Sequence, residues 1–214
     1  MTWIVEPVPD GLLFDTDSVC SLDRLLALAA VGFRGGIRTV TFSAGPDQSD
    51  ITAAEVGDFM KAGLGLMLYQ RVRDPGWIPS VALGVADAEI FVAKSTAAGY
   101  LAGASAWDDL EGISGTDVAT VAYANAKASR LKAAARPPGE YVGDDVPLTG
   151  AQLFTDLTAS VYWRSLSNVP DVATRGYAVR QIAEDVLIAG DLVDVNFATA
   201  DRLGGRPFWM RNAT

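Results

Sequence analysis

Histidine is absent from this sequence of 214 residues, and cysteine occurs once, as Cys20. Without histidine the chain cannot carry a Ser-His-Asp or Cys-His catalytic centre, an HExxH zinc site or imidazole acid–base chemistry. A single cysteine cannot form an internal disulfide and does not suffice for a thiolate metal site, so we expect Cys20 to be buried and inert. Any enzymatic chemistry must therefore come from carboxylates, hydroxyls, lysines or bound ions.

Positive charge is also scarce. The chain has 17 Lys and Arg residues against 26 Asp and Glu residues, which gives a net charge of −9. Binding to nucleic acids and attraction to anionic membranes both depend on clustered cations, so we expect neither as a partner. No apolar run approaches the roughly 18 residues of a membrane-spanning helix. Half of the residues are hydrophobic, which is enough for a sizeable core.

The amino-terminal segment MTWIVEPVPDG contains acidic residues and two prolines, and it lacks a basic region followed by an apolar one. This pattern does not predict a signal peptide. Three explanations stay open: the protein is cytoplasmic, it is released by a separate system, or its sequence was trimmed for expression.

Short apolar runs alternate with helical periodicity along the whole chain. A Pro or Ser/Thr start and a Gly stop delimit several of the helical segments. Thr52 with Glu55 three residues later has the pattern of a capping box. Strands are expected at 12–17, 36–42, 63–70, 103–111, 139–143, 160–166, 176–182 and 192–198, and helices from Ser18 or Ser21 to Ala30, at 52–63, 79–99 and 116–134, and briefly from Thr149.

About eight strands that are apolar on both faces indicate a parallel sheet covered by helices. The count favours a single (β/α)8 barrel of the TIM type over residues 1–214, with short or missing final helices because the later connections are short. A doubly wound open sheet is the alternative. The turn DTDSVCS after the first strand lacks the glycine-rich phosphate loop typical of that fold.

Acidic residues stand at the ends of two of these strands. Asp109 and Glu111 are two residues apart, so in a strand they point the same way, with Cα atoms about 6.6–6.8 Å apart, while Asp108 points to the helix side. Asp15 and Asp17 repeat this spacing, and Asp15 lies deeper, while Asp17 could cap the following helix. Two carboxylates on one face raise at least one pKa, which makes one a proton donor while the other stays ionised. The alternative is that these acids cap helices or are solvated.

Aromatic residues follow the same strand ends and could stack on sugar rings: Tyr69, Trp77, Trp107, Tyr141 and Trp163. The competing interpretation is that each is a large core or rim residue. Three cations late in one helix, Lys127, Arg130 and Lys132, are expected to complement its dipole and face water.

With these segments in their order, the chain resembles the glycoside-hydrolase-like TIM-barrel domain of actinobacterial cell-envelope proteins and phage proteins, which is related to the family 25 lysozymes. The resemblance covers nearly the whole chain. It rests on GLLFDTDS (11–18), AAEVGDFMKAGLGLMLYQ (53–70), GW…PS…ALG (76–84), WDDLEG (107–112), GEYVG (139–143), LTGAQLF (148–154), YWRSLSNVP (162–170) and LVDVNF (192–197).

The resemblance implies that Glu111 is the general acid/base and that Asp109 stabilises the anomeric centre or holds an N-acetyl group. It also implies that Asp15 is the acid that ends the first strand. Gln181 ends the seventh strand, and Asp194 matches the acid of the V-D-x-N close. The residues expected to bind substrate are Asp17, Tyr69, Trp107, Tyr141, Trp163, Gln181 and Asp194.

Three functions from different classes follow. The first is a glycosidase that cleaves a cell-envelope polysaccharide, peptidoglycan above all, by carboxylate catalysis without cofactor or metal. The second is a catalytically silent barrel that binds glycan or assembles with other virion or envelope proteins. The third is a phosphodiesterase whose carboxylates at positions 15, 17, 109 and 111 hold Mg²⁺ or Ca²⁺.

Overall fold

The computed structural model describes residues 2–188 and 190–213, and in these residues eight strands close into a barrel. Neighbouring strands from β2 to β8 are parallel, and β9 closes the barrel between β8 and β2. The expected barrel is thus confirmed, and the open sheet is excluded. The strands are β2 (Gly11–Thr16), β3 (Gly35–Val40), β4 (Gly65–Gln70), β5 (Ala106–Leu110), β6 (Pro138–Val142), β7 (Val161–Arg164), β8 (Val179–Ile188) and β9 (Asp191–Ala198).

The last strand departs from the parallel pattern. β9 is antiparallel to both of its neighbours and forms a hairpin with β8. Only residues 189 and 190 separate the two strands, and a parallel return would need a crossover of a dozen or more residues. Because β8 runs toward the same end of the barrel as β7, the hairpin rises at the end where the parallel strands finish.

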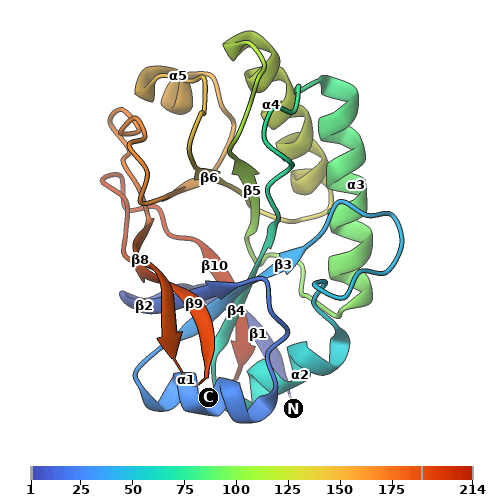
Figure 1. The fold of residues 1–214 in the computed structure, drawn as a ribbon, viewed down its shortest axis with the longest axis vertical. Helices are drawn as coiled ribbons and strands as arrows, with labels where there is room; N and C mark the ends of the chain where they lie inside the picture. The colour runs from blue at the N-terminus through green and yellow to red at the C-terminus, as the bar shows by residue number, and fades with distance from the viewer. Residues whose placement is uncertain (1, 189, 214) are drawn as a thin grey trace.

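Five helices occur in the described residues, and each begins after a Ser or Thr side chain that accepts a backbone N–H. They are α1 (Leu22–Ala30), α2 (Ala53–Ala62), α3 (Val81–Ala97), α4 (Asp117–Ala133) and the short α5 (Gly150–Thr155). In Figure 1, α3 and α4 lie to the right of the barrel, α1 and α2 lie along the bottom of the view, and β8 and β9 lie at the lower left. Residues 165–178, between β7 and β8, contain no helix, which confirms the expected shortening.

The amino-terminal end of the barrel is closed by strands that the sequence analysis did not foresee, β1 (Trp3–Pro7) and β10 (Phe208–Asn212). They pair with each other, and β10 pairs with β4. Trp209 of β10 is buried against Gly35 and Gly65. A Cβ atom would come within 2.7 Å of the Trp209 ring at Gly35 and within 2.1 Å at Gly65, so both positions need glycine.

Two buried ion pairs connect the strands to the helices. Arg38 of β3 donates to the Glu55 carboxylate of α2 at 2.6 Å, so this carboxylate is engaged with Arg38 and does not complete the cap at Thr52. The expected capping box at Thr52 is therefore only half formed. Lys127 of α4, expected to face water, is instead 1% exposed and paired with Asp108 of β5. The aliphatic stem and a buried carboxylate partner explain how this lysine is accommodated.

Candidate active site

A pocket of about 120 Å³ lies at the carboxyl ends of the barrel strands, which is the functional end of such barrels. An adjoining pocket of about 250 Å³ shares Asp15, Tyr69 and Asp194 with it and continues over Asp17 to the β8–β9 hairpin. The residues around the smaller pocket are Asp15, Tyr69, Asp109, Glu111, Tyr141, Trp163, Gln181 and Asp194. These include every proposed catalytic residue, and of the proposed substrate-binding residues only Asp17 and Trp107 are missing from it.

Asp109 is the most deeply buried acid of this pocket. It lies on β5, in register with Tyr141 of β6, and is 7% exposed. Its Oδ1 atom has no hydrogen-bond partner among the described residues. Burial, together with the charges of Glu111 and Asp108, raises its pKa well above the usual value. The Asp109 carboxyl thus keeps hydrogen-bonding capacity that the described residues do not use.

Glu111 follows directly after β5 and is half-buried at the rim of the pocket. Burial raises its pKa, and Asp144, Glu184 and Asp145 raise it further. Its side chain lies over Gly143, where a Cβ atom would be 2.5 Å from Glu111 Oε2. The Trp77 indole N–H donates to the Glu111 carbonyl oxygen at 2.8 Å and fixes the backbone there. The position of Glu111 thus depends on the missing side chain at residue 143.

Asp15 lies on β2 opposite Asp194 of β9 and is 9% exposed. The Asn196 amide donates to Asp15 Oδ2 at 2.6 Å, and Asn196 Oδ1 accepts from Trp163 Nε1 at 2.8 Å. Burial, and then the charge of Asp194, raises the pKa of Asp15 well above its usual value. Asn196 was not proposed as a site residue. Its position two residues after Asp194, on the same side of a strand, was the signal available in the sequence.

A second chain of hydrogen bonds holds the acid of β9. The Tyr141 hydroxyl donates to Gln181 Oε1 at 2.9 Å, and Gln181 Nε2 donates to Asp194 Oδ2 at 2.7 Å. The backbone N–H of Asp185, in the hairpin, donates to Asp194 Oδ1 at 2.9 Å. Burial raises the pKa of Asp194. The residues proposed at 141, 181 and 194 therefore form one connected unit.

Asp17 has a different environment from Asp15. It accepts hydrogen bonds from Thr39 and Tyr69 and pairs with Arg71 at 3.1 Å. It does not cap the following helix, as one expectation had it, because Ser21 is the residue that accepts the helix N–H at Arg24. Asp17 is thus a wall of the larger pocket.

The aromatic residues form an edge-to-face cluster around Trp163. Its ring centroid is 4.6 Å from that of Tyr141, 6.1 Å from that of Tyr69 and 5.8 Å from that of Trp107. The proposed role of Trp107 in stacking on sugars is wrong. It is fully buried inside the barrel, where its ring covers Gly139, so it supports Trp163 and offers no face to a ligand. The strand position alone did not reveal this depth.

Cys20 is buried, as expected, and burial raises the pKa of its thiol to about 11, so it is not a reactive thiolate. Among the described residues no group of three or more acids or cysteines is arranged to hold a metal ion. No helix in that part of the chain is long and apolar enough to cross a membrane.

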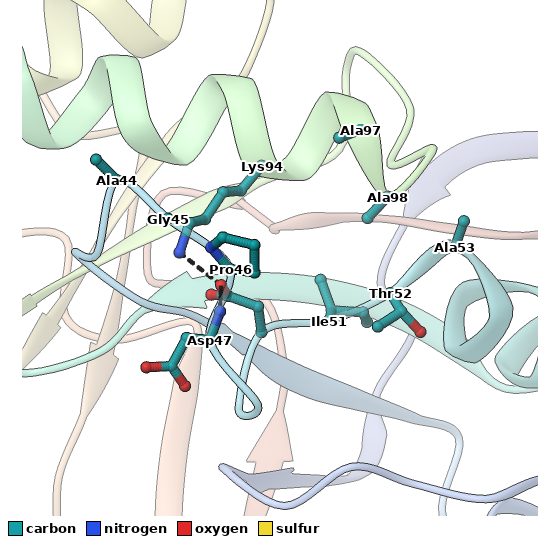
Figure 2. A pocket seen from close by; sticks show the side chains of 11 residues that line it. Ala44, Gly45, Pro46, Asp47, Ile51, Thr52, Ala53, Lys94, Ala97 and Ala98 are labelled. Atoms are coloured by element: carbon teal, nitrogen blue, oxygen red, sulfur yellow. Dashed lines mark hydrogen bonds and ion pairs between the residues drawn. The ribbon is translucent and has the colours of Figure 1, made fainter.

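A larger pocket, of about 380 Å³, lies away from these acids, between the segment after β3 and the end of α3. Figure 2 shows Lys94 reaching from α3 toward this segment, where it pairs with Asp50. Lys94 also donates to Thr41 at 2.8 Å. The remaining lining is mostly small and apolar, and its charged pair is already neutralised, so the convergent acids at the barrel mouth remain the better candidate site.

A closed barrel with acids gathered at the carboxyl ends of its strands fits a glycoside hydrolase-like domain. The chain belongs to the Rv2525c-like glycoside hydrolase-like domain family, whose model matches residues 27–198. The expected resemblance is thereby confirmed. Comparison with curated proteins gives no significant match.

Several solved structures share the fold. The Tat-secreted protein Rv2525c of Mycobacterium tuberculosis is 19% identical with a TM-score of 0.68, over 91% of this chain and 98% of that one. The modular autolysin LytC of Streptococcus pneumoniae is 13% identical with a TM-score of 0.62, over 89% of this chain and 47% of that one. The spore cortex lytic enzyme SleM of Clostridium perfringens is 13% identical with a TM-score of 0.62, over 89% and 67%. At these identities the likeness shows the fold alone.

Proposed function

We propose that this chain is a single-domain glycoside hydrolase that cleaves a cell-wall polysaccharide, with peptidoglycan as the substrate. The observation that carries the proposal is the convergence of Asp15, Asp109 and Glu111 on one pocket, with the pKa of each raised by burial. Perturbed carboxyls in a shared cleft are typical of acid–base sites. Lytic structural neighbours such as LytC and SleM support a glycan as substrate.

In the proposed reaction Glu111 is the general acid. Its raised pKa keeps a larger fraction protonated, so it can give a proton to the glycosidic oxygen as the bond to the anomeric carbon breaks. The resulting carboxylate then takes a proton from the water molecule whose oxygen bonds to that carbon. Asp109 and Asp15 stabilise the positive charge of the oxocarbenium-like state, or Asp109 holds an N-acetyl group of the substrate. Tyr69, Tyr141 and Trp163 form the wall against which the sugar ring lies.

Glu111→Gln tests this assignment because it keeps the size of the side chain and removes the proton donor. We expect the release of reducing ends from purified peptidoglycan to fall by about 10²- to 10⁴-fold, with the free energy of unfolding unchanged within about 0.5 kcal/mol. The matched control is Glu89→Gln on the exposed face of α3, which removes the same charge far from the pocket and should retain full activity. Equal activity in Glu111→Gln and the wild type would remove Glu111 from the mechanism.

A catalytically silent barrel gives a different result in the same assay. The wild type would then bind purified cell wall and release no reducing ends during long incubation. That result would overturn hydrolysis and leave glycan binding as the function of the pocket.

A further inference from the structure

The mouth of the barrel has an unusual balance of charge. Six carboxylates line its two adjoining pockets, and none of the described lining residues is a lysine or arginine. Asp144, Asp145 and Glu184 are close enough to raise the pKa of Glu111. The lining carboxylates are Asp15, Asp17, Asp109, Glu111, Asp185 and Asp194.

Among the described residues, Arg71 is the only cation that forms an ion pair with one of these lining acids. It pairs with Asp17 at 3.1 Å, and its side chain is half exposed. A pair of this kind is screened by water and neutralises one carboxylate at most. The remaining acids repel each other, which is why neighbouring charges contribute to the raised pKa of Asp15 and Asp109.

The aromatic and amide donors of the site are engaged within it, and the hydroxyls of Thr16 and Ser18 are the other side-chain donors of its described lining. The hydroxyl of Tyr69 donates to Asp17, that of Tyr141 donates to Gln181, and the Gln181 amide donates to Asp194. The Trp163 indole donates to Asn196, which itself donates to Asp15. In contrast, the buried Oδ1 of Asp109 has no hydrogen-bond partner in the part of the chain that the structure describes. Because six carboxylates and no lysine or arginine are among the described lining residues, acceptors outnumber the remaining donors, which favours a donor-rich or cationic ligand and disfavours an anionic one.

We propose that the pocket of about 250 Å³ at the barrel mouth is a subsite for a sugar residue with a free ammonium group. It lies next to the sugar residue whose bond is cleaved. This inference rests on the proposed function and specifies its substrate class as a glycan with de-N-acetylated amino sugars. Asp15, Asp17 and Asp194 are the acceptors for the ammonium group, which has three donors and no acceptor, as this lining requires. An N-acetylated sugar at the same place would present a neutral amide to carboxylates that still repel each other.

The test is a calorimetric comparison of glucosamine oligomers with N-acetylglucosamine oligomers of the same length. The protein is the Glu111→Gln variant, which slows turnover. The pH is low enough for the sugar amine to carry its proton. We expect the amine-bearing oligomer to bind about tenfold more tightly or better, with release of protons, because an ammonium group lowers the raised pKa of the acids around it. Equal affinity, or tighter binding of the N-acetylated oligomer, would overturn the proposal.

Second-site variants separate a local subsite from the general attraction of a chain with a net charge of −9. In the Glu111→Gln background, Asp194→Asn and Asp17→Asn should each reduce the preference about threefold or more, and Glu89→Gln should not change it. The Asp17 side chain is 38% exposed, so Asp17→Asn remains as the test if Asp194→Asn fails to fold. A preference that survives both pocket variants would overturn the subsite. Competition by Mg²⁺ without discrimination among sugars would assign the pocket to a metal ion instead.

Failure of this inference differs from failure of the proposed function, because binding and cleavage are measured separately. Tight binding of the glucosamine oligomer without any reducing ends from the wild type would retain the subsite and overturn hydrolysis. Efficient cleavage with a preference for N-acetylated oligomers would retain hydrolysis and overturn the subsite.

Discussion

Asp108 and Asp109 are neighbours on β5, yet they face opposite sides of the barrel wall. Asp108 is 2% exposed and is paired with Lys127 from α4. Asp109 is 7% exposed, and its Oδ1 atom lacks a partner among the described residues. The first arrangement joins a helix to the barrel, whereas the second leaves a carboxyl ready for a ligand. The difference between the two aspartates is thus the cation: Asp108 has Lys127 as its partner, whereas Asp109 forms no ion pair among the described residues and lines a pocket.

The strand next to β5 sharpens this contrast. Glu140 of β6 lies in register with Asp108 on the outer side of the wall. Burial and the charge of Asp108 raise the pKa of Glu140 well above its usual value. The charge of Lys127 opposes this rise in the pKa of Glu140, while the ion pair of Lys127 is with Asp108.

Lys127→Met has the largest expected effect because it leaves the buried Asp108 without a cation. We expect the free energy of unfolding to fall by about 3–5 kcal/mol, measured by urea denaturation at neutral pH. Lys132→Met, on the exposed part of the same helix, is the control and should change it by less than about 0.5 kcal/mol. A loss below about 1 kcal/mol at Lys127 would show that the pair does not compensate a buried charge.

Gly143→Ala should impair catalysis on the inner side of the barrel wall, where Glu111 lies, without unfolding the protein. The new Cβ atom would lie 2.5 Å from Glu111 Oε2, so the Glu111 carboxyl must move. A displacement of about 1 Å costs up to about 10²-fold in kcat. The reducing-end assay measures this loss. Gly57→Ala on α2, whose Cβ meets nothing within 4 Å, should keep full activity. An active Gly143→Ala protein would contradict the placement of Glu111.

Asp109→Asn should give a smaller effect, on the pH dependence of stability. Because the pKa of Asp109 is raised in the folded state, the folded protein binds more protons than the unfolded chain once pH exceeds about 4. This carboxyl therefore lowers the free energy of unfolding as pH rises through that window. Urea denaturation at several pH values should show Asp109→Asn gaining stability over the wild type with rising pH. A constant difference would contradict the raised pKa.

Much of the architecture could be predicted because local signals agreed with one another. Alternating apolar runs marked all eight barrel strands, and the short later connections indicated that helices would be lost there. The reversal of β9 was missed because the periodicity of a buried strand does not reveal its direction. The strands β1 and β10 were missed because their role depends on Trp209 meeting two distant glycines.

The acids at the candidate site were foreseen from their position at strand ends, together with the family resemblance. Tertiary depth was not visible in the sequence, so Trp107 was placed at the rim and Lys127 in water, although both are buried. Asn196 was overlooked as a partner of Asp15 because its hydrogen bond spans most of the chain.

The central claim is that Asp109 on β5 and Glu111 directly after it act on a glycosidic bond. A crystal structure of Glu111→Gln with a bound cell-wall oligosaccharide tests it most directly. The account predicts a glycosidic oxygen within about 3.2 Å of the residue 111 side chain, with a sugar ring against Tyr141 and Trp163. An oligosaccharide bound elsewhere on the barrel, with the pocket of Asp109 empty, would contradict it.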